Sequence, residues 1–191
     1  MKHNPKLIGD KVYLSPIGTS DGEVTAFTRW LNDATLTIQL DIFTWHLDRG
    51  QERAALQRLS EEGNVFAIYA REEDVLIGSC ALEDINWING TAECGILIGD
   101  AERRGKGYGS DAMRLLLDWA FNGLNLRNVW LKAYSFNKDA IRLYERLGFQ
   151  TVGHRRQSRT VAGKHYDTVY MDILATDFKS PYIKDLLPDD A

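Results

Sequence analysis

A basic, glycine-rich loop in the middle of the chain carries the residues best suited to chemistry. It follows the apolar residues 96–98 and reads Gly-Asp-Ala-Glu-Arg-Arg-Gly-Lys-Gly-Tyr-Gly-Ser over residues 99–110. When such a loop opens a helix, the first backbone N–H groups have no helical acceptor and lie at the positive end of the helix dipole. Helix starts of this kind bind phosphate. Arg103, Arg104 and Lys106 add positive charge, so we expect a phosphorylated ligand here.

Three common nucleotide-binding patterns fit this sequence poorly. A P-loop requires Gly-Lys-Ser/Thr, but Gly107 follows Gly105-Lys106 and supplies no hydroxyl for magnesium. A dinucleotide loop requires Gly-x-Gly-x-x-Gly, but Ser110 stands where the third glycine is needed. The His-Arg-Asp and Asp-Phe-Gly elements of a protein kinase are missing from the sequence. The pattern therefore indicates another class of phosphate site.

The spacing Arg104-x-x-Gly107-x-Gly109 resembles the acyl-CoA pyrophosphate loop of the GCN5-related N-acetyltransferases, the GNAT family. A second segment, Asn137-x-x-Ala-x-x-x-Tyr144-x-x-x-Gly-Phe, resembles a segment near the end of that family's fold. The two segments occur in the family's order, and the resemblance extends over residues 11–174. It implies acetyl-CoA as the co-substrate and no metal.

The resemblance also implies which residues hold acetyl-CoA. The pantetheine arm would pair with the backbone of Ile96, Leu97 and Ile98, in a gap between two splayed strands. The implied contacts to the rest of CoA come from Arg103, Arg104, Gly105, Lys106, Gly107, Tyr108, Gly109, Ser110 and Asn137. Asn137 is in addition a good N-cap for the helix that follows it.

Two residues are candidates for acid–base catalysis. In the family, a tyrosine at the position of Tyr144 lies near the CoA sulfur and can protonate the leaving thiolate. The alternative is that Tyr144 is only an aromatic residue of the core. Glu93 precedes the loop on its strand, where a carboxylate could take the amine proton, attract a cationic substrate or pair with a neighbour. Asp84 is a weaker candidate, and Cys94 is expected to be a small buried residue.

The composition of the chain limits the binding partners and the cellular location that we expect. The net charge of −4 argues against a nucleic-acid partner, whose binding surface would be basic. No apolar run reaches membrane-spanning length, and the N-terminal residues lack the apolar core of a signal peptide. With Cys80 and Cys94 as the only cysteines there is no disulfide framework, so a cytoplasmic location is expected.

The hydrophobic periodicity predicts an α+β protein with a mixed sheet of about seven strands flanked by helices. We expect a single acetyltransferase domain over residues 1–178 and a polar tail over residues 179–191. Gly123 and Gly148 are expected to end helices, and Ser20 to Glu23 has the spacing of a capping box. The expected strands are 11–15, 65–70, 75–82, 82–86, 91–98, 129–134, 151–156 and 165–174, and the expected helices begin near 21, 51, 108 and 138. Residues 38–47 are expected to form a loop or a distorted helix.

These features predict an acetyl-CoA-dependent N-acetyltransferase that moves the acetyl group to a primary amine by direct attack in a ternary complex. Residues 92–96, 105–109 and 163–167 resemble the branch of ribosomal-protein N-terminal and spermidine acetyltransferases. The expected acceptor is therefore a protein or peptide N-terminal amine. A polyamine or aminoglycoside acetyltransferase and a non-catalytic acetyl-CoA-binding sensor are the alternatives, and the sequence leaves open whether the chain forms a homodimer.

Overall fold

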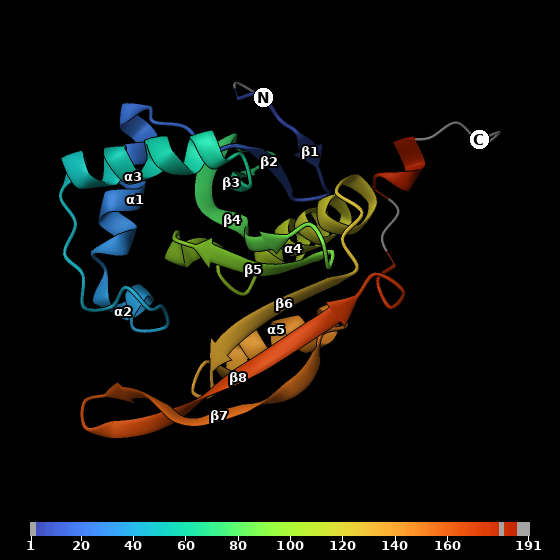
Figure 1. The fold of residues 1–191 in the computed structure, drawn as a ribbon. Helices are drawn as coiled ribbons and strands as arrows, with labels where there is room; N and C mark the ends of the chain where they lie inside the picture. The colour runs from blue at the N-terminus through green and yellow to red at the C-terminus, as the bar shows by residue number, and fades with distance from the viewer. Residues whose placement is uncertain (1–2, 180–181, 187–191) are drawn as a thin grey trace. The chain divides into compact units, whose positions relative to one another are not determined.

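The computed structural model describes residues 3–179 and 182–186 (Figure 1). The strands are β1 (Leu7–Ile8), β2 (Val12–Pro16), β3 (Val65–Ala70), β4 (Val75–Asn86), β5 (Thr91–Ile98), β6 (Asn128–Tyr134), β7 (Gln150–Val161) and β8 (Lys164–Leu174). The α-helices are α1 (Asp21–Leu31), α2 (Ala34–Thr37), α3 (Arg49–Glu62), α4 (Tyr108–Asp118) and α5 (Lys138–Leu147). Short 3-10 turns lie at Ala101–Arg103 and Lys184–Leu186, and a π-helical turn, Trp119–Gly123, continues α4.

The strands hydrogen-bond in the order β1-β2-β3-β4-β5-β6-β8-β7. The β5–β6 pair is parallel, whereas β1–β2, β2–β3, β3–β4, β6–β8 and β7–β8 are antiparallel. This confirms the predicted α+β class with a mixed sheet. Eight strands are described where about seven were expected. The expected strands 75–82 and 82–86 form the single strand β4, and β1, which was not expected, has two residues and is too short to show an alternating pattern.

The chain folds as two compact units, and we describe each by itself. The first contains the described residues up to 81 together with 95–116, and the second contains 82–94 together with the described residues from 117 onward. The prediction of one domain over residues 1–178 stays a prediction. Residues 180–181 and 187–191 of the predicted tail lie outside the described residues. In the part of the chain that is described, no helix is both long and apolar enough to cross a membrane.

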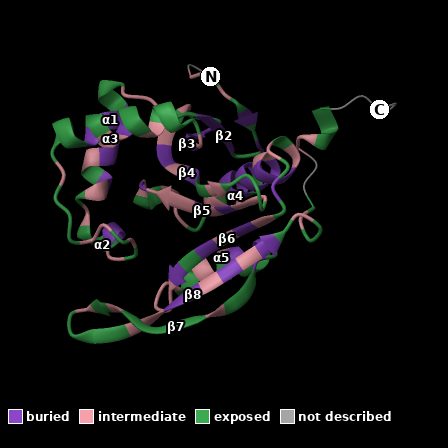
Figure 2. Ribbon diagram, viewed as in Figure 1, coloured by how far each residue is buried: buried purple, intermediate pink, exposed green. Residues whose placement is uncertain are grey.

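The first unit has its core between the strands β2 and β3 and the helices α1 and α3. All six residues of β3 are buried, whereas most residues of α3 are exposed and appear green in Figure 2. Phe27 and Trp30 of α1 pack with Leu56 of α3 and Tyr13 of β2 in this core. The predicted capping box is confirmed, since the Ser20 side chain accepts from the backbone of the third helical residue and that residue's carboxylate accepts from the Ser20 backbone.

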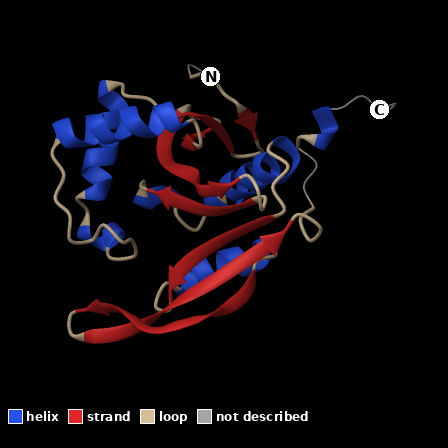
Figure 3. Ribbon diagram, viewed as in Figure 1, coloured by secondary structure: helices blue, strands red, loops and turns tan. Residues whose placement is uncertain are grey.

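The second unit packs α5 against the strands β6, β8 and β7 (Figure 3). The apolar alternation of β8 buries Val169, Met171 and Ile173. Gly148 ends α5 with φ of 100°, as predicted, and a Cβ there would lie 3.3 Å from Ile173. The β7–β8 hairpin is longer than the apolar pattern predicts, because its backbone pairing continues through polar residues as far as Val161↔Lys164.

The sequence predicts Gly123 as the C-terminal cap of the helix after the glycine-rich loop, but the cap is the next residue, Leu124. Gly123 is the last residue of the π-helical turn, and the positive φ in this region belongs to Asn125 at 56°. A Cβ at Gly123 would come within 2.7 Å of the Trp119 ring. The glycine therefore provides room for an aromatic ring rather than an unusual backbone angle.

Candidate functional site

The glycine-rich loop joins the end of β5 to the start of α4, as the sequence predicts. Gly105 and Gly107 have φ values of 72° and 89°, in the left-handed region that side chains disfavour. Helix α4 begins at Tyr108 directly after them, so its first N–H groups face the loop. The loop therefore has the backbone form of an anion-binding helix start.

Two arginines of the loop stabilise its shape. Arg104 donates from Nε to the Ile98 carbonyl at 2.9 Å and from Nη2 to the Gly99 carbonyl at 3.0 Å. Arg103 donates to Oε1 of Glu73 at 2.6 Å and to the Tyr108 hydroxyl at 3.1 Å. The Arg103 guanidinium lowers the pKa of the Glu73 carboxyl. These contacts fix the loop to the end of β5 on one side and to the turn between β3 and β4 on the other.

Lys11 is a further cation at this loop, and sequence reasoning missed it. Its Nζ donates to the Lys106 carbonyl at 2.8 Å, and a Cβ at Gly107 would lie 3.4 Å from that nitrogen. The Asp111 carboxylate in the first turn of α4 accepts from the backbone N–H groups of Lys11 and Val12 at 2.7 and 3.0 Å. Because 95 residues separate Lys11 from Lys106, no local spacing signals the contact.

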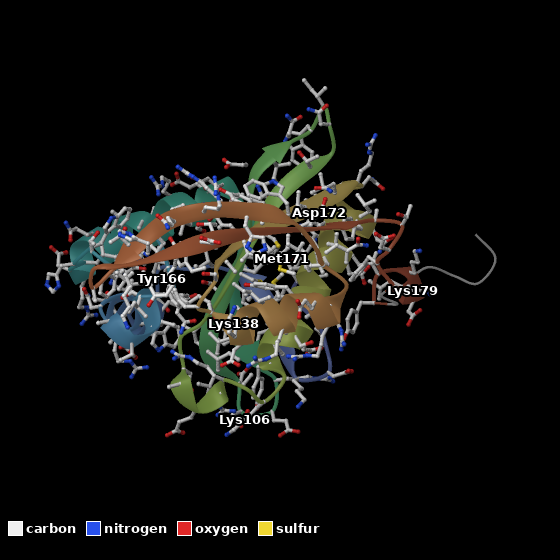
Figure 4. All side chains as sticks on the ribbon, turned by 90° about the horizontal axis from the view of Figure 1, so that it is seen from below. Lys106, Lys138, Tyr166, Met171, Asp172 and Lys179 are labelled. Atoms are coloured by element: carbon white, nitrogen blue, oxygen red, sulfur yellow. The ribbon has the colours of Figure 1, made fainter. Side chains whose placement is uncertain are left out.

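Lys106 itself is exposed and lies at the tip of the loop (Figure 4). The other residues predicted to hold CoA in the first unit are placed on β5 and α4. Ile96, Leu97 and Ile98 form the end of β5 and are partly buried, while Gly109 and Ser110 lie in the first turn of α4. The first unit thus brings the predicted loop residues together and adds Lys11 to them.

Glu93 lies in the second unit, on β5 opposite Trp130 of β6. Its side chain is 12 % exposed, and Lys132 Nζ lies 3.5 Å from its carboxylate. Burial raises the pKa of Glu93, Lys132 lowers it in part, and the nearby charges of Glu83 and Asp84 raise it again. A carboxyl that holds its proton to a higher pH than an ordinary glutamate is a stronger base, which suits it to accept a proton.

Tyr144 is a buried residue of α5, 8 % exposed, and its ring packs edge-on against Phe149 with centroids 5.8 Å apart. Burial raises the pKa of its phenol, and the nearby Cys94 adds to the rise. The phenol therefore keeps its proton at any working pH. Cys94 is buried, as expected.

Asn137 caps α5, since its side chain accepts from the Ala140 N–H at 3.2 Å. This confirms its predicted role as an N-cap, and its contact with CoA stays a prediction. In the described residues no group of three or more His, Cys, Asp or Glu side chains is arranged to hold a metal ion.

Comparison with known proteins gives one family. Residues 11–150 match the family model of the acetyltransferase (GNAT) domain. A Bacillus licheniformis protein named uncharacterized N-acetyltransferase p20 is 28% identical over 177 residues, which are 90% of this chain and 97% of that protein. The spermidine N(1)-acetyltransferase of Vibrio cholerae is 35% identical over 103 residues, which are 54% of this chain and 59% of that protein.

A solved structure has the same fold. The spermidine N-acetyltransferase from Vibrio cholerae in complex with CoA and spermine superposes with a TM-score of 0.77 at 23% sequence identity. The superposition covers 87% of this chain and 97% of that one. At this identity the likeness concerns the fold alone.

Proposed function

Since the chain belongs to the GNAT acetyltransferase family, we propose that it transfers the acetyl group of acetyl-CoA directly to the N-terminal amine of a protein or peptide. Family membership makes the chain an N-acetyltransferase that uses acetyl-CoA. The acceptor and the roles of the individual residues are the proposal.

The observation that supports the proposal is the partly buried carboxylate of Glu93. A protein N-terminal amine has an ordinary pKa of about 7.7–8.0 and is largely protonated at neutral pH, so it must lose a proton before it can attack. Glu93 is a partly buried carboxylate with a raised pKa, beside the cation Lys132. It accepts the amine proton, directly or through a water molecule.

The remaining steps follow from the chemistry of acyl transfer. The neutral amine nitrogen attacks the thioester carbon and the C–N bond forms. The C–S bond then breaks to release CoA thiolate, and the nitrogen loses its second proton to solvent. Tyr144 donates its hydroxyl hydrogen to the developing thiolate. Because the raised pKa of Tyr144 exceeds that of a free thiol, about 8.5, the phenol acts mainly as a hydrogen-bond donor while solvent supplies the final proton.

The loop of the first unit suits the diphosphate of CoA. The backbone N–H groups at the start of α4 offer donors, and Lys106 and Lys11 supply positive charge. Arg103 and Arg104 act on the loop itself, through the bonds that fix its shape. In this proposal the lysines contact phosphate and the arginines stabilise the loop, whereas the sequence predicts a direct phosphate contact for every loop cation.

The number of enclosed carboxylates favours an acceptor with one positive charge. Glu93 is partly buried, whereas Glu83 and Asp84 are exposed and their charges are screened by water. An N-terminal ammonium needs one such partner, and a polyamine needs several along its length. A polyamine is the second candidate, favoured by the additional charges of Glu83 and Asp84 and by the similarity to the Vibrio cholerae spermidine enzyme.

The acceptor is tested with a panel of peptides, polyamines and aminoglycosides, by CoA release and by mass spectrometry of the products. We expect acetylation of peptide N-terminal amines with kcat/KM above that of spermidine and of the aminoglycosides. Acetylation of spermidine in preference to every peptide would replace the first candidate by the second. Acetyl-CoA binding with no acetylated product from any amine would identify a non-catalytic sensor.

Glu93→Gln should lower kcat by about 10²-fold, at the lower end of general-base effects, since solvent can also accept the amine proton. In the wild type, kcat/KM should rise as pH increases through the pKa of Glu93, because the carboxylate is the form that accepts a proton. The mutant should lack that rise and keep its affinity for acetyl-CoA.

Glu145→Gln is the matched control, since it removes an exposed carboxylate from α5 and should leave the pH–rate profile unchanged. Steady-state rates with the best acceptor over a range of pH make the comparison. A Glu93→Gln enzyme with the profile and rate of the wild type would assign Glu93 a structural role.

A further inference from the structure

One face of the sheet formed by β5, β6 and β8 in the second unit carries Glu93. Strand β6 buries Val129, Leu131 and Ala133, so its alternate residues Trp130, Lys132 and Tyr134 occupy the opposite face. The register places Tyr170 of β8 opposite Lys132. The ion pair between Glu93 and Lys132 puts the Glu93 carboxylate on this same face.

Partly exposed aromatic rings follow one another along this face towards the β7–β8 hairpin. Trp130 stacks on Tyr170 with ring centroids 6.2 Å apart. Tyr134 stacks on Phe136 at 5.6 Å, and Phe136 meets Tyr166 edge-on at 4.8 Å. Figure 4 marks Tyr166 and Asp172 at different positions along β8. Rigid aromatic rings with polar edges are well suited to contact an extended chain at low entropic cost.

The hairpin end of the face is cationic. The Arg159 guanidinium lies 4.6 Å from the centroid of the Tyr134 ring. Arg155 of β7 is exposed and lies opposite Thr168 of β8 in the sheet register, and Thr168 lies opposite Tyr134 of β6. Residues 150–168 contain four Arg and Lys side chains and one acidic one, although the whole chain has a net charge of −4.

The two ends of the face therefore differ in charge. Glu83, Asp84 and Glu93 make the end beside Lys132 acidic. Trp130 lies opposite Glu93, and Tyr134 lies four residues further along β6, which is about 13 Å of strand. An extended peptide of four residues has the same length. A chain with its amine at Glu93 would thus bring its fifth residue near Arg155 and Arg159.

We propose that this face is a specificity surface for acceptors that carry carboxylates a few residues from the reacting amine. The acceptor strip, as we call it, comprises Glu93, Trp130, Tyr134, Tyr170, Arg155 and Arg159. It takes an extended peptide with its N-terminal amine at Glu93 and with acidic side chains at positions four to six beside the two arginines. This inference rests on the proposed function, because it assumes a peptide acceptor.

The test uses three peptides that differ only at positions four to six, with acidic, neutral or basic side chains there. The wild type should acetylate the acidic peptide with a kcat/KM about three- to fivefold above the neutral one, the size expected for an exposed ion pair. The basic peptide should be poorer than the neutral one. The preference should shrink as salt increases, because salt screens exposed charges.

Charge reversal makes the test specific. Arg155→Glu changes an exposed residue and should reverse the order, so that the basic peptide becomes the best of the three. Arg159→Gln should reduce the preference for the acidic peptide. Arg146→Gln is the matched control, since Arg146 is an exposed cation of α5 and should leave the preference as in the wild type.

The outcomes separate the two proposals. Acetylation of all three peptides at one rate, or an unchanged order in Arg155→Glu, would overturn the acceptor strip and leave the peptide acceptor in place. Acetylation of none of the peptides, with turnover of spermidine, would overturn both. A reversed order in Arg155→Glu with an unaffected Arg146→Gln would support the strip.

Discussion

Tyr144→Phe is expected to lower kcat by about 10²–10³-fold, the range for loss of one hydrogen-bond donor to a developing negative charge, and to leave KM for acetyl-CoA nearly unchanged. The substitution removes one hydroxyl and keeps the ring that packs against Phe149. The loss falls on kcat because the thiolate that the phenol contacts develops only as the C–S bond breaks. Burial keeps the phenol protonated, so the effect should not vary with pH in the neutral range.

Stability should change little by comparison. The loss of one buried hydroxyl should lower the free energy of unfolding by about 1 kcal/mol. Tyr13→Phe is the matched control, because Tyr13 is a buried tyrosine whose hydroxyl donates to Asp74 at 2.6 Å. It should lower the stability and leave kcat intact. A Tyr144→Phe enzyme within about twofold of the wild-type kcat would show that the hydroxyl does not stabilise the leaving thiolate, and Tyr144 would then be a core residue only.

Gly107→Val is expected to abolish measurable acetyl-CoA binding in a protein that still folds. Gly107 has φ of 89°, which a β-branched residue adopts only under strain. A Cβ there would also lie 3.4 Å from Lys11 Nζ, and the further valine carbons would occupy the space where phosphate approaches the backbone. Calorimetric titration of acetyl-CoA measures the affinity, and thermal unfolding measures the fold.

Gly63→Val separates backbone strain from loss of the site. Gly63 ends α3 with φ of 75°, and a Cβ there meets nothing within 4 Å. The control should lose a similar amount of stability and keep the acetyl-CoA affinity of the wild type. An undiminished affinity in Gly107→Val would exclude the glycine-rich loop as the phosphate site.

Elements with strong local signals could be predicted from the sequence. The capping box at Ser20, the buried strand Val65–Ala70 and the stop of α5 at Gly148 each depend on residues close together in the chain. Gly123 misled the prediction because a C-terminal glycine usually signals a left-handed cap, whereas here the packing of the Trp119 ring requires the space.

Contacts over long sequence separations could not be predicted. Lys11 is held at the loop because its backbone N–H donates to the Asp111 carboxylate. The two residues are 100 positions apart, so the contact has no local sequence signature. The ion pair of Glu93 with Lys132 depends on the parallel register of β5 and β6. The loop could be predicted because its glycines and basic residues stand next to one another in the sequence.

Binding of acetyl-CoA compared with ATP and NAD tests the central claim most directly, namely that the loop of residues 99–110 holds the diphosphate of CoA. Calorimetric titration of the wild type with each ligand should show saturable binding of acetyl-CoA and much weaker binding of the other two. Acetyl-CoA at about 100 times its Kd should raise the free energy of unfolding by about 2.7 kcal/mol. Equal affinity for ATP and acetyl-CoA, or the same acetyl-CoA affinity in Gly107→Val as in the wild type, would contradict the account.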